Sequence, residues 1–411
     1  MSFFSNLVSS FSGPARLSLL GAARRIYADW AATAPMHPEV KDAMASVRRT
    51  AANPSSLYRE GVEAKRILES FRTSCAHIVS ARPDEVYFTS GGTEANNTVI
   101  RGITDACMAA GANANDLHLV STSIEHSSVL EPLRRLASLG AKITFVDPGQ
   151  DGVVRAEDIL AAVRPNTVLV TCMLANNEIG TVQQVSRIGA GLRKLKAERE
   201  SDYPIFHVDA CQTPLWMSCD MEGMRADAMT LDGHKMQGPK GVGALVLRRG
   251  IECAPLILGG GQERGMRATT ESLELIAGFT KAFELAHKGR DARVVKAKAM
   301  RNRLVTHIER RIPDAAINGT LERRLPNNLN VSLPNISDPE FAVIKLDEMG
   351  IACSTKSSCL KGEEDSYVVA AMLKGKGWRS RNTLRFTLDP DIDERDVDRI
   401  ADALEMLAQN P

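Results

Sequence analysis

The sequence predicts an α/β protein with a large, mostly parallel, seven-stranded domain and a smaller α+β domain. Two observations support this fold class. Short β-rich runs alternate with helical patterns from about residue 60 to 250, and the pattern changes after about residue 285. Such alternation is typical of parallel sheets, in which each helix returns the chain to the same edge. A chain of 411 residues is long enough to form both domains.

The large domain is predicted from strand-like runs bounded by turns. Helical stretches separate them: one begins at Thr93, one spans Ser127–Leu139, and Ile188–Leu195 has the amphipathic pattern of a crossover helix. The seven expected strands are Val86–Ser90, Leu119–Ser123, Ile143–Val146, Val168–Met173, Ile205–Asp209, Ala228–Leu231 and Ala244–Leu247.

The smaller domain is predicted from the change of pattern near residue 285. A long basic helix is expected over Ala286–Ile312, and a charged amphipathic helix over Asp393–Leu407. Strands are expected at Leu329–Leu333, Ile351–Ser354 and Thr383–Thr387. We therefore predict a large domain over residues 37–287 and a small domain formed by residues 1–36 and 288–411.

Composition narrows the classes of partner. Lysine plus arginine (51) nearly balance aspartate plus glutamate (50), which gives no electrostatic reason to expect nucleic acid or a membrane surface. No apolar run is long enough to span a bilayer. Eight scattered cysteines without zinc-ribbon spacing predict no metal site and indicate free thiols in a reducing, cytoplasmic compartment.

The first 28 residues leave the localisation open. They contain Arg16, Arg24 and Arg25 and no acidic residue. This composition fits a transit peptide for mitochondria or another organelle matrix. A short N-terminal extension that packs as a helix is the alternative, and it is favoured because no clear cleavage signal follows.

Three segments carry candidate chemistry. Ser90-Gly91-Gly92-Thr93-Glu94 joins a strand to a helix, where backbone N–H groups and the helix dipole favour an anion. Asp209 ends a strand at the edge where open α/β sheets bind ligands, and a carboxylate there can keep a pyridine nitrogen protonated. Lys235 follows the next strand, where a desolvated amine can form a Schiff base. Each segment alone is also compatible with a turn, a helix cap or a surface lysine.

The order of these segments resembles the cysteine desulfurase family of the IscS/NifS type, which are class V aminotransferase-like, fold-type I enzymes dependent on pyridoxal 5′-phosphate (PLP). The similar segments run in the family's order from residue 27 to about 400. They are Tyr27–Thr33, Asn53–Ser56, Thr89–Glu94, Glu125-His126, Asn176–Gly180, His207–Ala210, Gly233–Lys235, Gly259–Gly265, Asn327–Ser332 and Leu384–Phe386.

The resemblance implies how the cofactor would be held. Lys235 would bind it as a Schiff base, Asp209 would pair with its pyridine nitrogen, and Gln212 would hydrogen-bond its ring oxygen. His126 would stack on the ring and move protons. Asn177 would contact both cofactor and substrate.

The phosphate and the substrate would have their own partners in the same scheme. Gly92, Thr93 and His234 would contact the phosphate, while Thr270 would reach the cofactor of the partner subunit in a homodimer. Arg385 would bind the substrate carboxylate together with Asn177, because its planar fork matches a carboxylate.

The expected nucleophile is Cys359. It lies in Ser357-Ser358-Cys359 before Asp365-Ser366-Tyr367-Val368, as the family's catalytic cysteine does, and Lys356 and Lys361 would favour its thiolate. The length of this segment implies a mobile loop that carries a persulfide to an acceptor protein. Cys353 is interpreted as a core residue, with a resolving thiol as the alternative.

The resemblance implies conversion of L-cysteine to L-alanine, with the sulfur passed to acceptor or iron–sulfur scaffold proteins, for iron–sulfur cluster assembly or tRNA thiolation. Selenocysteine lyase, another fold-type I PLP lyase and a weakly active scaffold are the alternatives. Two positions depart from the family. Asp232 replaces a phosphate-binding serine, and a carboxylate there would repel the phosphate unless it is turned away or neutralised. Lys356 replaces a glycine before the cysteine.

Overall fold

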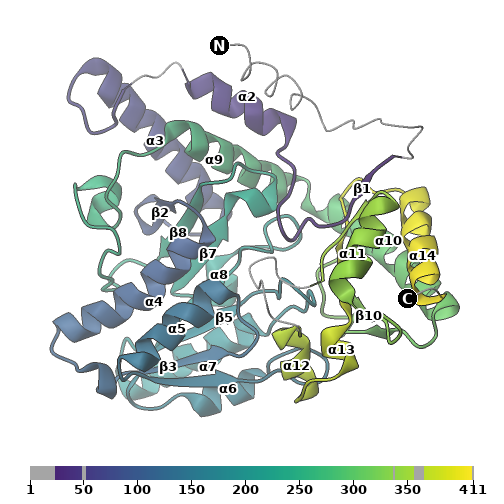
Figure 1. Cartoon of the computed structure of the whole chain (residues 1–411). Helices are drawn as coiled ribbons and strands as arrows, with labels where there is room; N and C mark the ends of the chain where they lie inside the picture. The colour runs from purple at the N-terminus through teal and green to yellow at the C-terminus, as the bar shows by residue number, and fades with distance from the viewer. Residues whose placement is uncertain (1–23, 49–51, 337, 356–364, 410–411) are drawn as a thin grey trace, which may run out of the picture.

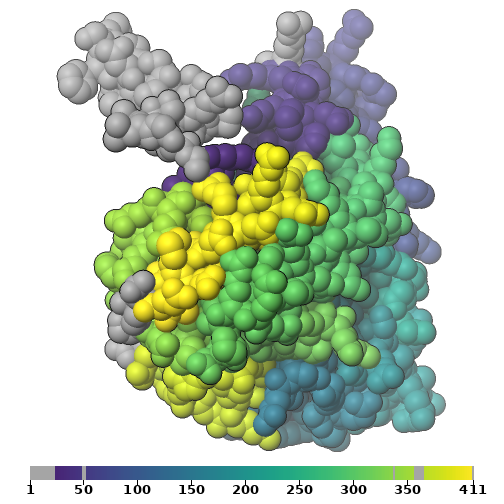
Figure 2. All heavy atoms as spheres, turned by 90° about the vertical axis from the view of Figure 1, so that its right-hand side faces the viewer, coloured from purple at the N-terminus to yellow at the C-terminus, as the bar shows by residue number. Residues whose placement is uncertain are grey.

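The computed structural model describes residues 24–48, 52–336, 338–355 and 365–409. A larger part surrounds a seven-stranded sheet, and a smaller part comes mainly from the C-terminal third of the chain (Figure 1). In the space-filling view of Figure 2, the green to yellow C-terminal residues form one continuous surface beside the teal residues of the larger part. The predicted α/β fold class is confirmed.

The large sheet has the strand order β2-β8-β7-β6-β5-β3-β4. β8 runs antiparallel to both of its neighbours, and the other adjacent pairs are parallel. Each strand begins and ends within one residue of the predicted run. The strands are β2 (Val86–Thr89), β3 (His118–Thr122), β4 (Lys142–Val146), β5 (Thr167–Met173), β6 (Ile205–Asp209), β7 (Ala228–Asp232) and β8 (Gly243–Leu247).

Apart from the edge strand β4, the sheet is buried on both faces. Successive strand residues point to opposite sides, so each strand contributes to two apolar clusters. Leu119 and Leu169 pack in one apolar cluster, whereas Val120 and Val170 pack in another. The first cluster includes α4 (Gly92–Ala109) and α5 (Ser127–Ser138). The second includes α3 (Arg59–Ile78), α6 (Ala156–Ala162), α7 (Val185–Arg199), α8 (Met221–Met224) and α9 (Leu273–Lys288), and α2 (Pro38–Val47) lies against α9.

The smaller part has its own core. In it, β10 pairs antiparallel with β12 and β9, and β1 pairs parallel with β11. Ile26 and Ala28 join this core, while Trp30 packs in the core of the larger part. The boundaries between the two expected domains, near residues 36 and 288, stay a prediction. The elements are β1 (Ile26–Tyr27), α10 (Arg290–Arg311), β9 (Ala316–Ile317), β10 (Asn328–Ser332), α11 (Pro339–Glu348), β11 (Ile351–Ala352), α12 (Tyr367–Leu373), α13 (Trp378–Arg381), β12 (Thr383–Thr387) and α14 (Glu394–Gln409).

The prediction of one helix over Ala286–Ile312 is wrong. α9 ends at Lys288, and α10 begins at Arg290. Gly289 separates them, since glycine disfavours a helix interior by about 1 kcal/mol relative to alanine. The Arg293 guanidinium donates to the carbonyl oxygens of Leu285 and Ala286, and so satisfies the end of α9.

Within the described ranges, no helix combines the length and the apolar character that crossing a bilayer requires.

Candidate active site

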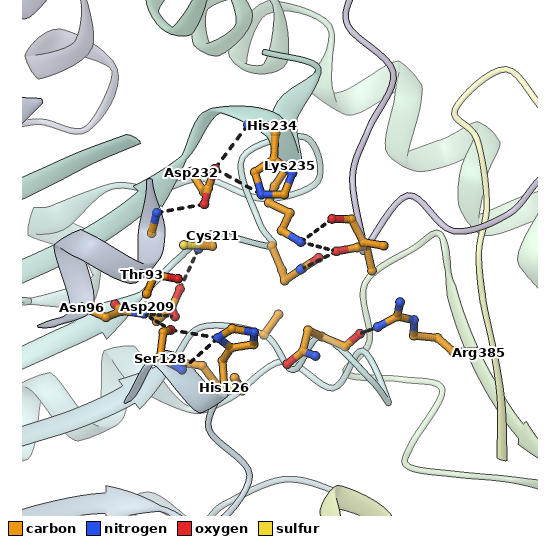
Figure 3. A pocket seen from close by; sticks show the side chains of 17 residues that line it. Thr93, Asn96, His126, Ser128, Asp209, Cys211, Asp232, His234, Lys235 and Arg385 are labelled. Atoms are coloured by element: carbon orange, nitrogen blue, oxygen red, sulfur yellow. Dashed lines mark hydrogen bonds and ion pairs between the residues drawn. The ribbon is translucent and has the colours of Figure 1, made fainter. Parts of the chain in front are cut away.

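The candidate residues converge at one edge of the large sheet. The turns after β2, β3, β5, β6 and β7 all open there, as expected for the carboxyl ends of parallel strands. They enclose a cavity of about 200 Å³, which is also lined by the segment Ala31-Ala32 and by Arg385 from β12. Figure 3 shows Arg385 on the opposite side from Thr93 and Asn96. The residues of the cavity wall include Gly92, Thr93, Asn96, His126, Ser128, Asn177, Asp209, Cys211, Gln212, Asp232, His234 and Lys235.

Lys235 enters the cavity from a short 3-10 helix, Gly233–Met236, directly after β7. Its Nζ donates to the carbonyl oxygens of Ala31 and Ala32 at 2.6 and 2.7 Å. Gln212 Nε2 donates to the same Ala31 oxygen at 3.1 Å. Lys235 and Gln212 therefore approach the cavity from neighbouring turns, and both donate to the Ala31 carbonyl oxygen.

Asp209 begins a chain of hydrogen bonds across the cavity floor. Its Oδ2 accepts from Asn96 Nδ2 at 2.8 Å, and its Oδ1 accepts from the backbone N–H of Cys211 at 3.0 Å. Asn96 Nδ2 also donates to Ser128 Oγ at 2.8 Å, and Ser128 Oγ lies 2.8 Å from His126 Nδ1. Figure 3 shows the four side chains in sequence.

A backbone hydrogen bond fixes the position of the hydrogen on the neutral His126 ring. The backbone N–H of Ser128 donates to Nδ1 of His126 at 3.1 Å, so Nδ1 is an acceptor and the neutral ring carries its hydrogen on Nε2. Burial lowers the pKa of His126, and the charge of Lys235 lowers it further against the opposing effect of Asp209. His126 is therefore a neutral ring that can donate a hydrogen bond from Nε2.

The anion site at the start of α4 contains a carboxylate. Gly92 is the first residue of α4, and a Cβ added there would lie 2.6 Å from Cys211 Sγ and 3.2 Å from Asp232 Oδ2. The Gly92 N–H donates to Asp232 Oδ2 at 2.8 Å. His234 Nε2 lies 3.5 Å from Asp232 Oδ1. Asp232 is thus not turned away from the site. Hydrogen bonds and a neighbouring histidine compensate its charge instead.

Arg385 and Asn177 meet at the opposite side. Arg385 is 1% exposed, and its guanidinium donates to Asp29 Oδ1 at 2.6 Å and to the Asn177 carbonyl oxygen at 3.0 Å. Within the described residues, Arg385 Nε and Asn177 Oδ1 are buried without a hydrogen-bond partner. Unsatisfied buried groups of this kind are rare, and here they sit where a polar ligand would complete them.

Burial holds several cysteines of the described chain as thiols. Burial raises the pKa of Cys75 and Cys253 to about 12 and that of Cys219 to about 11. Burial, together with Asp209 and Asp232, also raises the pKa of Cys211 in the cavity wall. Cys353 is 8% exposed and packs in the smaller core, as predicted.

The structure does not test every predicted site residue. Cys359 lies outside the described residues, as do Lys356 and Lys361. Thr270 is exposed and is not part of the wall formed by its own chain, so its contact with a partner subunit's cofactor remains a prediction.

Sequence reasoning missed Asn96, Ser128 and Asp29. A signal existed for the first two: Asn96 lies one helical turn after Thr93, and Ser128 follows His126 at the start of α5. Residues one turn apart share a helix face, so both positions could have been placed at the strand edge. Nothing near Asp29 in the sequence indicates its ion pair with Arg385, 356 residues later.

Comparison with known proteins finds one family and relatives that carry the same enzyme name. Residues 26–400 match the family Aminotransferase class-V. Cysteine desulfurase IscS of Dictyoglomus turgidum is 36% identical over 94% of this chain and 95% of its own length. Cysteine desulfurase of Nostoc sp. is 34% identical over 92% of each chain.

Solved structures with a similar fold cover most of this chain. A NifS-like protein superposes with a TM-score of 0.85 at 31% identity, covering 94% of this chain and 99% of that one. SspA in complex with cysteine superposes with a TM-score of 0.74 at 31% identity, covering 89% and 99% of the two chains.

Proposed function

The chain belongs to the class-V aminotransferase family and is related to cysteine desulfurases over nearly its whole length, and we propose from this premise that it is a PLP-dependent cysteine desulfurase. It converts L-cysteine to L-alanine and passes the sulfur to an acceptor protein. The observation that carries the proposal is the convergence of Lys235, Asp209 and His126 on one cavity at the carboxyl edge of the sheet.

The residues present fit PLP. A lysine amine, a buried carboxylate, an imidazole and a helix N-terminus whose first residue leaves little room for a Cβ line the same cavity of about 200 Å³. Lys235 would hold the aldehyde carbon, Asp209 the pyridine nitrogen, Gln212 the ring oxygen, and Thr93 and His234 the phosphate. When bound, the pyridine ring supplies an electron sink for charge that develops on the substrate's α-carbon.

The chain's own groups would perform the proton and sulfur steps. The Lys235 amine takes the proton from the substrate α-carbon. His126, neutral with its hydrogen on Nε2, would donate a hydrogen bond next to the cavity. The Cys359 thiolate would attack the substrate sulfur and the carbon–sulfur bond would break, leaving the sulfur on Cys359 as a persulfide. The electron pair of the broken bond stays with the substrate carbon, which takes up a proton on the way to L-alanine.

Arg385 and Asn177 would bind the substrate carboxylate. Arg385 lines the cavity, its buried Nε has no hydrogen-bond partner within the described residues, and Asp29 holds the guanidinium in place at 2.6 Å. The ion pair with Asp29 also compensates the buried arginine before substrate arrives, which limits the cost of an unpaired charge.

The segment that contains Cys359 is anchored beside the cavity at both ends. Ser354 pairs with the backbone of Arg385, and Ser366 Oγ donates to Glu178 at 2.6 Å. The Tyr367 hydroxyl donates to the carbonyl oxygen of Glu125, next to His126, at 2.5 Å. Cys359 is the fifth residue after Ser354, so the two are at most about 18 Å apart along the chain. This reach supports Cys359 as the nucleophile.

Among the described residues, the cavity wall contains no cysteine that is suited to act as the nucleophile. Cys211 is in the wall, but burial and two neighbouring carboxylates raise its pKa and keep it protonated, which makes it a poor nucleophile. Homodimerisation, with Thr270 completing the partner's site, and acceptors in iron–sulfur assembly or tRNA thiolation are part of the same proposal.

The test is a comparison of Cys359→Ser with the parent chain. We expect the variant to keep the visible absorption band of bound PLP and its shift on adding L-cysteine, while alanine and sulfide formation fall by at least about 10³-fold. Cys107→Ala, outside the cavity wall, is the matched control and should retain activity. Full sulfide release from Cys359→Ser would refute the assigned nucleophile. A parent chain that binds PLP but makes no alanine would favour another PLP lyase.

A further inference from the structure

We propose that Asp232 binds the cofactor phosphate through a shared proton, so that cofactor binding by this chain takes up one proton from solvent. The inference rests on the proposed function, because it requires a phosphate-bearing cofactor in the cavity. It concerns a residue at which the sequence departs from the family it resembles.

The geometry places the Asp232 carboxylate inside the anion site. Its Oδ2 accepts the N–H of Gly92 at 2.8 Å, at the first residue of α4. Free N–H groups at a helix start are the usual partners of a phosphate. The Asp232 side chain is 13% exposed and lines both the main cavity and the adjoining one next to Thr93 and His234. A bound phosphate would therefore contact this carboxylate.

The groups that face Asp232 keep it ionised before the cofactor binds. Burial alone would raise its pKa, but the hydrogen bonds and charge of His234, the Gly92 N–H and the charge of Lys235 together lower it. His126 lies within electrostatic reach, Cys211 is a neutral thiol, and Lys240 lines the adjoining cavity. His234 Nδ1 is 3.1 Å from Thr33 Oγ1, which holds this ring at the site.

Two acidic groups in one site share a proton, because the second negative charge is strongly disfavoured. The phosphate of free PLP is a dianion above about pH 6. When it enters beside Asp232, a proton from solvent bonds to the carboxylate, and the new O–H donates to a phosphate oxygen. The other carboxylate oxygen continues to accept the Gly92 N–H. Protonated Asp232 thereby supplies the donor that a serine hydroxyl would supply.

The experiment uses the full-length chain freed of cofactor and titrated with 4′-deoxypyridoxine 5′-phosphate. This probe lacks the aldehyde, so no bond to Lys235 contributes protons of its own. Calorimetry in two buffers of different ionisation enthalpy counts the protons taken up. We expect about one proton per site, and a Kd that rises about tenfold between pH 7 and pH 8.

Asp232→Asn is the decisive variant, because an amide donates to the phosphate and accepts from Gly92 without any added proton. We expect no proton uptake and a Kd that changes less than about twofold over the same pH unit. Asp232→Ser serves as a second variant with the same expected result, should the amide disturb folding. Phosphorus NMR of the bound probe gives an independent readout of phosphate ionisation.

Equal proton uptake by the parent chain and both variants would overturn the role of Asp232 while leaving the cofactor assignment intact. A parent chain that binds neither the probe nor PLP at any pH would overturn the proposed function as well. The two failures are therefore distinguishable.

Discussion

A buried carboxyl group behind the cavity, Glu125, makes the stability of this protein depend on pH. Its Oε1 accepts the Thr122 hydroxyl at 2.7 Å and the Met173 N–H at 2.9 Å. Its Oε2 is buried and has no hydrogen-bond partner within the described residues, as expected if it carries the proton. Burial is the main cause that raises the pKa of Glu125 from 4.5 to about 8.

The sign follows from proton binding. Between its unfolded pKa of 4.5 and its folded pKa of about 8, Glu125 holds more proton when folded than when unfolded, so rising pH favours unfolding. From pH 6 to pH 8 this amounts to about 2 kcal/mol of lost stability. For a chain of 411 residues, that corresponds to a melting temperature lower by roughly 2 to 3 °C.

Glu125→Gln removes the titrating group and keeps its shape. The variant should lose this part of the pH dependence, so the difference in melting temperature between variant and parent grows by about 2 to 3 °C from pH 6 to pH 8. Differential scanning calorimetry of the two proteins in matched buffers measures it. A difference that stays constant across this range would refute a neutral Glu125. A second substitution, Glu131→Gln on the exposed face of α5, provides the control.

Two further substitutions test the site. Ser128→Ala removes the hydroxyl next to His126 but keeps the backbone N–H that fixes its tautomer. We expect kcat to fall about tenfold with a shifted acidic limb of the pH–rate profile, whereas Ser127→Ala should change neither, and identical profiles for the two variants would exclude a role of the Ser128 hydroxyl at His126. Arg385→Lys keeps the charge but loses the fork that pairs with Asp29, so KM for L-cysteine should rise about 10- to 100-fold with PLP still bound, and an unchanged KM would exclude Arg385 as the carboxylate partner.

Much of the fold follows from local sequence pattern. The strands of the large sheet were predicted to within one residue because β-branched runs ending at glycine or polar turns are a local signal. The helix over residues 286–312 was predicted wrongly because its apolar spacing continues through Gly289. The break depends on capping by Arg293, a contact between two successive helices that periodicity does not reveal.

The site residues likewise divide into those that the sequence revealed and those that only the folded chain brings together. Lys235 and Asp209 were found because Lys235 follows a strand and Asp209 ends one, so the chain's order already places them at one edge. His126 was found from the resemblance to the family. The partners that tune them were not found. Asn96 meets Asp209 across 113 residues, and Asp232 meets Gly92 across 140, so these hydrogen bonds exist only after the sheet has formed.

The arrangement of thiols follows from the task that a sulfur carrier performs. A nucleophile fixed in the cavity wall, at the position of Cys211, would keep its sulfur within an enclosure of about 200 Å³ that no acceptor protein enters. Burial and the carboxylates of Asp209 and Asp232 also make that position unsuitable for a thiolate. A reactive thiol therefore belongs on a segment outside the sheet, tied at both ends to the cavity. Ser354 and Ser366 provide those ties, which is the physical reason to place the sulfur-accepting cysteine between them.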